Sequence, residues 1–348
     1  MSNDAIELVS FSDLDVHDPF FESLRDDYRS FDVWFRKKAN QGEKAYILRE
    51  EELMGFLYLK EEDEATDSIT PKFDKKRRLK IGTFKIEAHG TVLGERFISL
   101  ILKKMIEENY NESYVTIFSK HHALIKLLEQ YGFSIWGKNN NGELVYTKTH
   151  DERHNIFKDF PRIMIQEKNK YILSIYPEYH TKLFFYSRLQ TEKNHVIEDL
   201  SFTNTIEKVY LAGMRGMDKI KTGDLIIIYR TAEQGKIAEW NSVVTSICTV
   251  IDAKHINDFI SYEDLREYCG KGTIFTETEL LDLWKTKKYP YIIKMLYNIS
   301  LPKRIVRNKL IENGVIERSS YAGFIPLSDM QFKKILELGE VNESFVID

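Results

Sequence analysis

The feature of this sequence that most constrains its fold is an alternation of β-rich runs and amphipathic helices over residues 79–133. LKIGTFKIE (79–87) has strand character, and the helix after it is marked by apolar residues four apart, such as Phe97 and Ile101. YVTIF (114–118) is a second β-rich run, and the segment HALIKLLEQYGF follows it as a second helix that Gly132 ends. The segment GKNNNGELVYTK then closes the unit as a hairpin, with Asn-Asn-Gly at its turn. Because helices alternate with strands here, we expect an α/β (α+β) unit.

The chain has 348 residues, a length that predicts two domains, which we place at 1–150 and 160–348. The formal net charge of −4 is not basic, so any contact with nucleic acid has to come from a local patch. The strongest basic cluster is KKRRLK (75–80). It either contacts phosphates or forms a solvated loop that faces the acidic residues 61–64.

The cysteines and the N-terminus bear on the cellular compartment. Cys248 and Cys269 do not form a Cys-x-x-Cys pair, which disfavours a thiolate zinc site and fits a reducing environment. The first ten residues carry Asp4 and Glu7 and lack a signal-peptide pattern. We therefore expect a cytoplasmic protein. No metal-binding pattern and no apolar run of membrane-spanning length is found in the sequence, so neither a metal nor a membrane is expected.

The segment HGTVLGER (89–96) joins the first strand to the first helix of the alternating region. Such a junction can hold a phosphate on the free backbone N–H groups of the helix start. Gly90 and Gly94 would let the backbone approach a ligand closely, and Arg96 adds a positive charge in the first turn. The alternative is a tight turn without a ligand. The flanking strand and helix favour ligand binding.

Over residues 5–148 the sequence resembles the GNAT superfamily of N-acyltransferases. HGTVLG (89–94) stands where the family has Arg/Gln-x-x-Gly-x-Gly/Ala, with His89 in place of Arg or Gln and Val92 in place of the first glycine. The more specific piece is KHHALIKLLEQYGF (120–133), which is similar to the family's Asn-x-x-Ala segment ending in Leu-Tyr-Glu-Lys-x-Gly-Phe. The resemblance implies a mixed central sheet with flanking helices.

The resemblance also implies that acetyl-CoA binds where two central strands splay apart. Main-chain groups near Phe84, Lys85 and Ile86 would then pair with the amides of the pantetheine arm. The pyrophosphate would lie on a loop and helix start that comprise Gly90, Thr91, Val92, Gly94, Glu95 and Arg96. For acyl transfer, the acceptor amine has to be deprotonated and the leaving thiolate has to gain a proton.

No proton donor stands where the family often has one, because Leu128 occupies the position of the tyrosine. Three other residues are candidates for proton transfer. Glu87 ends the strand before the loop, and the alternative is a solvated strand end. His122 follows the later strand beside His121, and the alternative is a polar loop pair. Tyr131 lies one helical turn beyond Leu128, and the alternative is packing at the helix end.

The second half of the chain has short apolar β-rich runs separated by Gly, Asp, Lys and Glu. KTGDLIIIYRT (221–231), together with SVVTSICTVIDA, is similar to the PUA-like group, which includes ASCH and EVE domains. The resemblance covers roughly residues 160–345 and implies a compact β-barrel with inserted helices. Two helices are predicted at 262–268 and 277–286, the second of them with a capping box at its start.

PUA-like domains bind RNA or hold a nucleobase, which requires cations and aromatic planes for stacking. The residues available for this in the second half are Arg215, Arg230, Trp240, Lys303, Arg304 and Tyr321. The alternative is ordinary for each of them, with Trp240 and Tyr321 in the core and the charged residues on the surface.

Together the two resemblances predict an acetyl-CoA-dependent N-acetyltransferase. Its second domain would recognise an RNA-linked substrate such as a tRNA or an aminoacyl-tRNA, in the role of a toxin or an RNA-modifying enzyme. The competing hypothesis is a nucleic-acid-binding regulator that senses acyl-CoA and does not catalyse its transfer.

Overall fold

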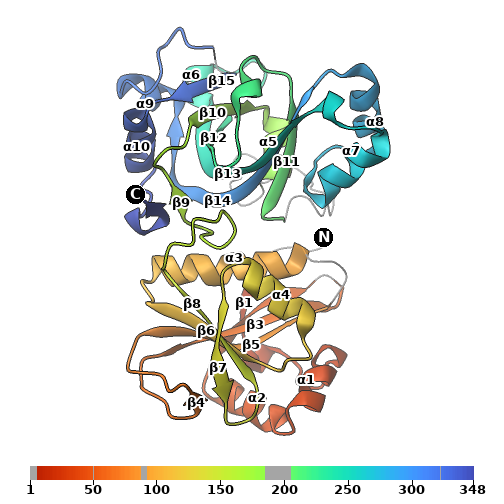
Figure 1. The fold of residues 1–348 in the computed structure, drawn as a ribbon, viewed down its shortest axis with the longest axis vertical. Coiled ribbons are helices and arrows are strands. Elements are labelled where there is room, and N and C mark those ends of the chain that lie inside the picture. The colour runs from red at the N-terminus through yellow and green to blue at the C-terminus, as the bar shows by residue number, and fades with distance from the viewer. Residues whose placement is uncertain (1–5, 50, 88–91, 185–204, 322) are drawn as a thin grey trace. The chain divides into compact units, whose positions relative to one another are not determined.

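The structure is a computed structural model that describes residues 6–49, 51–87, 92–184, 205–321 and 323–348. The chain divides into two compact units, Met1–Asp151 and Glu152–Asp348. Each unit is described by itself, and Figure 1 shows the elements of both.

The first unit is built on an eight-stranded mixed sheet with the strand order β1-β2-β3-β5-β6-β8-β7-β4. Its strands are β1 (Glu7–Ser10), β2 (Lys44–Arg49), β3 (Leu53–Glu62), β4 (Ile69–Thr70), β5 (Arg78–Ile86), β6 (Glu112–Ile117), β7 (Ser134–Asn139) and β8 (Leu144–Thr149). Neighbouring strands are antiparallel except β5 and β6, which are parallel. The predicted mixed central sheet is therefore confirmed.

Helices cover both faces of this sheet: α1 (Glu22–Asp27), α2 (Phe31–Asn40), α3 (Val92–Glu107) and α4 (His122–Gln130). Figure 1 shows α1 and α2 on one face and α3 and α4 on the other. Two successive residues of β3 show that the two pairs of helices pack on opposite faces. Gly55 lies against the ring of Phe97 from α3, whereas Phe56 packs edge-on to Phe21 on the side of α1 and α2. Successive residues of a strand point to opposite faces, so the two helical layers lie on opposite sides of β3.

The elements after β6 end where the sequence predicts. The cap of α4 is Tyr131, and Gly132 follows it with a φ of +88°, the left-handed conformation that glycine adopts without strain. The turn between β7 and β8 contains Gly142 at a φ of +81°. The predicted helix end and hairpin are both confirmed.

The second unit contains a six-stranded mixed sheet with the order β11-β14-β13-β12-β10-β15. Its strands are β10 (Lys170–Ile175), β11 (Glu207–Ala212), β12 (Leu225–Arg230), β13 (Val243–His255), β14 (Tyr291–Val306) and β15 (Phe324–Leu327). Only β10 and β12 are parallel to each other. A second, two-stranded sheet joins β9 (Ile163–Met164) to β16 (Val346–Ile347).

The predicted barrel of this unit is not closed by strand pairing in the described part of the chain. The first and last strands of the order, β11 and β15, are not paired with each other there. The long strands β13 and β14 pair with register shifts at three places. Since such irregularities bend and twist a sheet, the second unit has a bent open sheet where we expected a closed one.

The helices of the second unit are α5 (Pro177–Leu183), α6 (Ala238–Asn241), α7 (Tyr262–Cys269), α8 (Glu277–Thr286), α9 (Arg307–Glu312) and α10 (Asp329–Leu338). Both inserted helices predicted from the sequence are present as α7 and α8. Thr276 and Glu279 form the predicted capping box at the start of α8. Across the described residues of both units, we find no helix with the length and apolarity needed to span a membrane.

Candidate functional site

A β-bulge at Gly82 separates β5 from β6. The two strands pair in parallel only over Arg78–Ile81 of β5, and their pairing ends there. On the other edge of β5, Tyr58 and Leu59 of β3 pair with the residues on either side of Gly82, which itself has no partner in that register. A bulge bends its strand and increases the local twist. The strand β5 therefore leaves β6 directly after its last paired residue.

Beyond the bulge, Phe84 and Ile86 present main-chain groups to the gap between the strands. The N–H of Glu87 donates a hydrogen bond to the carbonyl of Met54 at 2.9 Å, so the main-chain groups of Glu87 face β3. Main-chain groups alternate in direction along an antiparallel strand, and those of Lys85 therefore face β3 as well. It follows that the N–H and C=O groups of Phe84 and Ile86 point away from β3, into the space beside β6.

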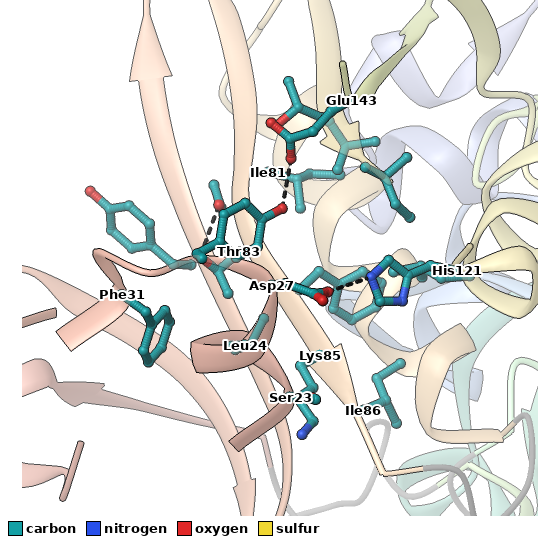
Figure 2. A pocket seen from close by; sticks show the side chains of 18 of the residues that line it. Ser23, Leu24, Asp27, Phe31, Ile81, Thr83, Lys85, Ile86, His121 and Glu143 are labelled. Carbon is teal, nitrogen blue, oxygen red and sulfur yellow. Dashed lines mark hydrogen bonds and ion pairs between the residues drawn. The ribbon is translucent and has the colours of Figure 1, made fainter. Parts of the chain in front are cut away.

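A cavity of about 1050 Å³ occupies this gap (Figure 2). Its walls come from both helical layers as well as from the sheet. Leu24 and Asp27 of α1 line it from one face, whereas Gly94 of α3 and Leu127 of α4 line it from the other. Along the strands it is lined by Lys80–Glu87 and by Val115, Thr116 and Ile117. The cavity therefore has walls on both faces of the sheet.

Gly94 brings α3, α4 and β5 together at one wall of the cavity. A Cβ atom at this position would lie 2.6 Å from Cδ2 of Leu127 and 3.2 Å from Cδ1 of Ile86. The first distance is shorter than any normal carbon–carbon contact, so only a glycine fits without displacing a neighbour. The first turn of α3 thus lies directly beside the cavity.

Asp27 and His121 contact each other at the wall of the cavity (Figure 2). Oδ2 of Asp27 lies 2.9 Å from Nε2 of His121, and Oδ1 pairs with Nζ of Lys120. The side chain of Asp27 is only 5% exposed. Burial acts to raise the pKa of Asp27, but the hydrogen bonds from Lys120 and His121 outweigh it and hold this pKa below its ordinary value. The Asp27 carboxylate therefore stays ionised near neutral pH.

Tyr28 ties α1 to the β7–β8 turn at the edge of the same cavity. Its hydroxyl donates a hydrogen bond to Oε1 of Glu143 at 2.6 Å, and Nδ2 of Asn139 donates to Oε2 of Glu143 at 2.6 Å. Burial and the neighbouring Glu143 both raise the pKa of Tyr28, which therefore remains protonated. These bonds satisfy a buried carboxylate and hold the wall on the α1 side in place.

The structure brings part of the predicted donor site to this cavity. Phe84, Lys85, Ile86 and Gly94 all line it. The description of the chain does not include Gly90 and Thr91, and it resumes at Val92, the first residue of α3. Glu95 and Arg96 follow in the first turn of α3 but are not among the described residues that line the cavity.

The expectation that Arg96 points its charge at the ligand is not supported by its position. The Arg96 residue is buried, between Gly94 and the fully buried Phe97. A helix start presents its N–H groups along the axis, whereas the direction of a side chain depends on its place around the helix. Arg96 is thus buried in the first turn of α3, and a role for it at the ligand stays a prediction.

The predicted proton-transfer residues are divided between the cavity and the core. Glu87 and His122 line the cavity, and Oε1 of Glu87 lies 3.2 Å from Nζ of Lys85. Tyr131 is fully buried at the end of α4, as is Leu128, and it does not occur among the described residues of the cavity wall. The ring of Tyr131 thus packs inside the unit, where a substrate in the cavity does not reach it.

Sequence reasoning missed Asp27, Tyr28, Lys120 and Glu143 and left His121 as one member of a polar pair. Asp27 and His121 are 94 positions apart in the sequence. Neither local periodicity nor a motif connects them, so only the fold reveals their contact. In the basic cluster 75–80, Arg77 forms an ion pair with Glu61 of the acidic segment 61–64, at 2.9 Å.

In the second unit, Trp240 and Tyr321 are exposed, at 58% and 85%, so the alternative that places them in the core is wrong. Arg230 is buried and binds Glu233 at 3.1 Å, and Lys303 binds Glu340 at 2.7 Å. The two remaining candidates differ in exposure, since Arg304 is partly buried and Arg215 is exposed.

Several of these residues share one edge of the six-stranded sheet. The strands β10 and β12 are parallel and end at this edge, and the antiparallel strand β14 also ends there. Arg230 ends β12, and Arg304 lies two residues before the end of β14. Trp240 lies in α6 shortly before β13, and Tyr321 lies shortly before β15; both strands start at the same edge. The topology therefore gathers cations and exposed aromatic rings at one end of the sheet.

Comparisons with known proteins found similar solved structures of two kinds. No family model matches the sequence, and no protein of curated function matches it. Solved structures similar to this chain include GNAT acetyltransferases and ASCH proteins. Both resemblances expected from the sequence, to the GNAT fold and to the ASCH type of PUA-like domain, thus have counterparts among solved structures.

Three structures illustrate the likeness. A GNAT-family acetyltransferase from Listeria monocytogenes is 18% identical, with 32% of this chain and 67% of that chain covered at a TM-score of 0.27. The N-acetyltransferase PseH of Campylobacter jejuni, in complex with acetyl coenzyme A, is 16% identical. The match covers 42% of this chain and 100% of PseH at a TM-score of 0.29. The ASCH protein of Zymomonas mobilis is 12% identical, with 49% and 94% covered at a TM-score of 0.32. These likenesses concern the fold and not the activity.

Proposed function

We propose that this protein is an acyl-CoA-dependent N-acyltransferase with acetyl-CoA as its donor. The observation that carries the proposal is the cavity that the bulge at Gly82 opens through the sheet. Acyl transfer requires a donor and an acceptor to meet with their reacting atoms in contact and aligned. A cavity with walls from both helical layers allows the two to enter from opposite faces and meet between β5 and β6.

The donor would be held mainly by main-chain groups. Phe84 and Ile86 direct N–H and C=O groups into the gap, where the amides of a pantetheine arm would pair with them as a missing strand does. The first N–H groups of α3 have no partner within the helix and carry the positive end of its dipole. They lie beside Gly94, at the wall of the cavity, where the pyrophosphate would bind.

Catalysis in this proposal depends first on position. Holding an amine against a thioester supplies a large part of the rate without any acid or base. Glu87 and His122 line the cavity and are candidates for proton transfer, whereas the buried Tyr131 has no such role in the proposal.

For the second unit we propose recognition of an RNA-linked acceptor. The support is the edge of the six-stranded sheet at which the exposed Trp240 and Tyr321 lie with Arg304. Exposed aromatic rings stack on unpaired bases, and neighbouring cations contact phosphates. An aminoacyl-tRNA offers both a single-stranded end and a primary amine.

Two experiments in sequence test the proposal. Calorimetry with acetyl-CoA should give saturable binding below millimolar ligand, and thiol release should then rise when amines or aminoacyl-tRNAs are added. Binding without turnover on any acceptor would favour the regulator that senses acyl-CoA. The absence of binding at millimolar acetyl-CoA would contradict both.

A further inference from the structure

We infer that His121 is the base that takes the proton from the acceptor amine and that Asp27 is the residue that positions it. The inference rests on the proposed acyltransferase function and adds a proton acceptor to it. It starts from three observations on one contact. Both side chains line the cavity, their Nε2 and Oδ2 atoms are 2.9 Å apart, and Asp27 is buried whereas His121 remains 42% exposed.

The contact determines which nitrogen of His121 carries a proton. An ionised carboxylate only accepts hydrogen bonds, so Nε2 of His121 has to donate to Asp27. In the neutral ring, Nδ1 is then left with a free lone pair, which is the form that a base requires. The same carboxylate stabilises the imidazolium ion that forms when the proton arrives.

Lys120 does not displace His121 from Asp27, because the two bind different oxygens. Nζ of Lys120 pairs with Oδ1 and the ring of His121 pairs with Oδ2. The lysine is 62% exposed and its charge is largely balanced by solvent and by Asp27. The other titratable and charged groups that line the cavity include Tyr28, Lys85, Glu87, His122 and Glu143.

Other side chains that line the same cavity are less suited to act as the base. The carboxylate of Glu87 is already engaged by Nζ of Lys85 at 3.2 Å. Within the described part of the chain, no carboxylate holds His122, which begins α4 one position after the paired histidine. Glu143 is buried and already accepts bonds from Tyr28 and Asn139. His121 alone combines access to the cavity with a fixed orientation.

The reaction then balances as follows. The nitrogen of the neutral amine attacks the thioester carbonyl carbon and forms the C–N bond. The attacking nitrogen becomes positively charged, and Nδ1 of His121 removes one of its protons. The C–S bond breaks, its electron pair goes to sulfur, and the imidazolium ion returns the proton to the thiolate. The products are an amide and a free CoA thiol, and His121 ends neutral, as it began.

The test uses four variants of the full chain: His121→Ala, His122→Ala, Asp27→Asn and His17→Ala. His121→Ala should lower kcat for thiol release about 100-fold, the usual contribution of a general base, and leave the Kd for acetyl-CoA unchanged. Added imidazole should restore part of this loss, because the site is open to solvent. Asp27→Asn should lower kcat while the KM and the Kd for acetyl-CoA stay near their wild-type values, since the ring of His121 loses the carboxylate that orients it. His17→Ala changes an exposed histidine of the same unit outside the cavity wall and should behave as wild type.

The outcomes separate this inference from the function on which it rests. If the wild-type protein binds no acetyl-CoA, the proposed function fails. If it binds and turns over, but His121→Ala keeps the wild-type kcat and pH profile, the function stands and the inference is overturned. A loss confined to His122→Ala would overturn it equally and assign the base to the neighbouring residue.

Discussion

Gly82 lies directly against the ring of Tyr58: a Cβ atom at position 82 would come within 2.7 Å of Cδ1 of that ring. The Tyr58 ring cannot move away freely, because it is buried and packs edge-on to Phe11 at 5.3 Å and to Trp34 at 5.8 Å. The bulge that opens the sheet therefore depends on a residue without a side chain. In a sequence whose strands otherwise favour bulky residues, this glycine has a definite structural cause.

Gly82→Ala should therefore disturb both the unit and its cavity. We expect the free energy of unfolding to fall by about 1–3 kcal/mol, the usual cost of overpacking, and the Kd for acetyl-CoA to rise. Urea denaturation and calorimetry measure the two effects. Gly314→Ala is a suitable control, because Gly314 lies in the second unit at a φ of +66° with open space around it. It should cost stability through backbone strain and leave the Kd unchanged.

Gly94→Ala should weaken acetyl-CoA binding by displacing Leu127, Ile86 or both from the cavity wall. The double variant with Leu127→Ala provides the matched control, since it makes room for the new methyl group. In a double-mutant cycle, the two changes should couple, with part of the affinity lost in Gly94→Ala regained in the pair. Strict additivity of the two effects on Kd would show that this contact does not shape the site.

The first unit should lose part of its stability at acidic pH through Asp27. Its pKa is lowered in the folded protein, so the ion pairs of Asp27 stabilise the fold above the unfolded pKa of about 3.9. This contribution is lost as the pH falls through the lower, folded value. Thermal unfolding of wild type and Asp27→Asn should therefore differ near neutral pH and converge in acid. A constant difference down to the lowest pH would contradict the assignment.

The cysteines should not interfere with a thiol-release assay. Cys248 and Cys269 are both buried, and burial raises the pKa of Cys269 to about 12. A thiol reagent attacks the thiolate, so the native protein should not react at neutral pH. Both thiols should react after denaturation. Rapid labelling of the native chain would mean that one of them is accessible.

Trp240→Ala and Tyr321→Ala should each weaken binding to single-stranded RNA. Loss of one stacking ring costs about 1–3 kcal/mol per base, and the exposure of both residues means that stability should not change. Ile260→Ala removes an exposed apolar side chain elsewhere in the same unit and should have no effect on RNA binding. Fluorescence anisotropy at two salt concentrations measures the change. Equal affinity for all three variants would argue against this edge of the sheet as the RNA surface.

Much of the first unit follows from the sequence, because its signals are local. Periodic apolar residues predict α3 and α4, and Gly132 predicts the end of α4. Even the bulge leaves a trace, since Gly82 interrupts the β-rich run LKIGTFKIE. What the sequence does not reveal is the direction of side chains around a helix. The sequence places Arg96 in the first turn of α3, but only the structure shows that this arginine is buried.

The parts that sequence analysis missed depend on contacts between distant segments. The Asp27–His121 pair joins α1 to the loop before α4, and nothing near either residue indicates the other. In the second unit, each strand was recognisable, but closure of the sheet depends on register. The shifts along β13 and β14 determine that register and have no simple sequence pattern.

The central claim is that the gap beside Phe84 and Ile86 binds acyl-CoA through main-chain groups. Its most direct test is calorimetry of acetyl-CoA with Ile86→Pro, because proline removes one of the two N–H groups that face the gap and no bond of the β3–β5 ladder. Lys85→Pro is the matched control for folding, because it removes an N–H group that faces β3 and not the gap. The account predicts that Ile86→Pro unfolds near the wild-type temperature, binds acetyl-CoA at least about tenfold more weakly, and is far more stable than Lys85→Pro. Wild-type affinity in a folded Ile86→Pro variant would contradict it.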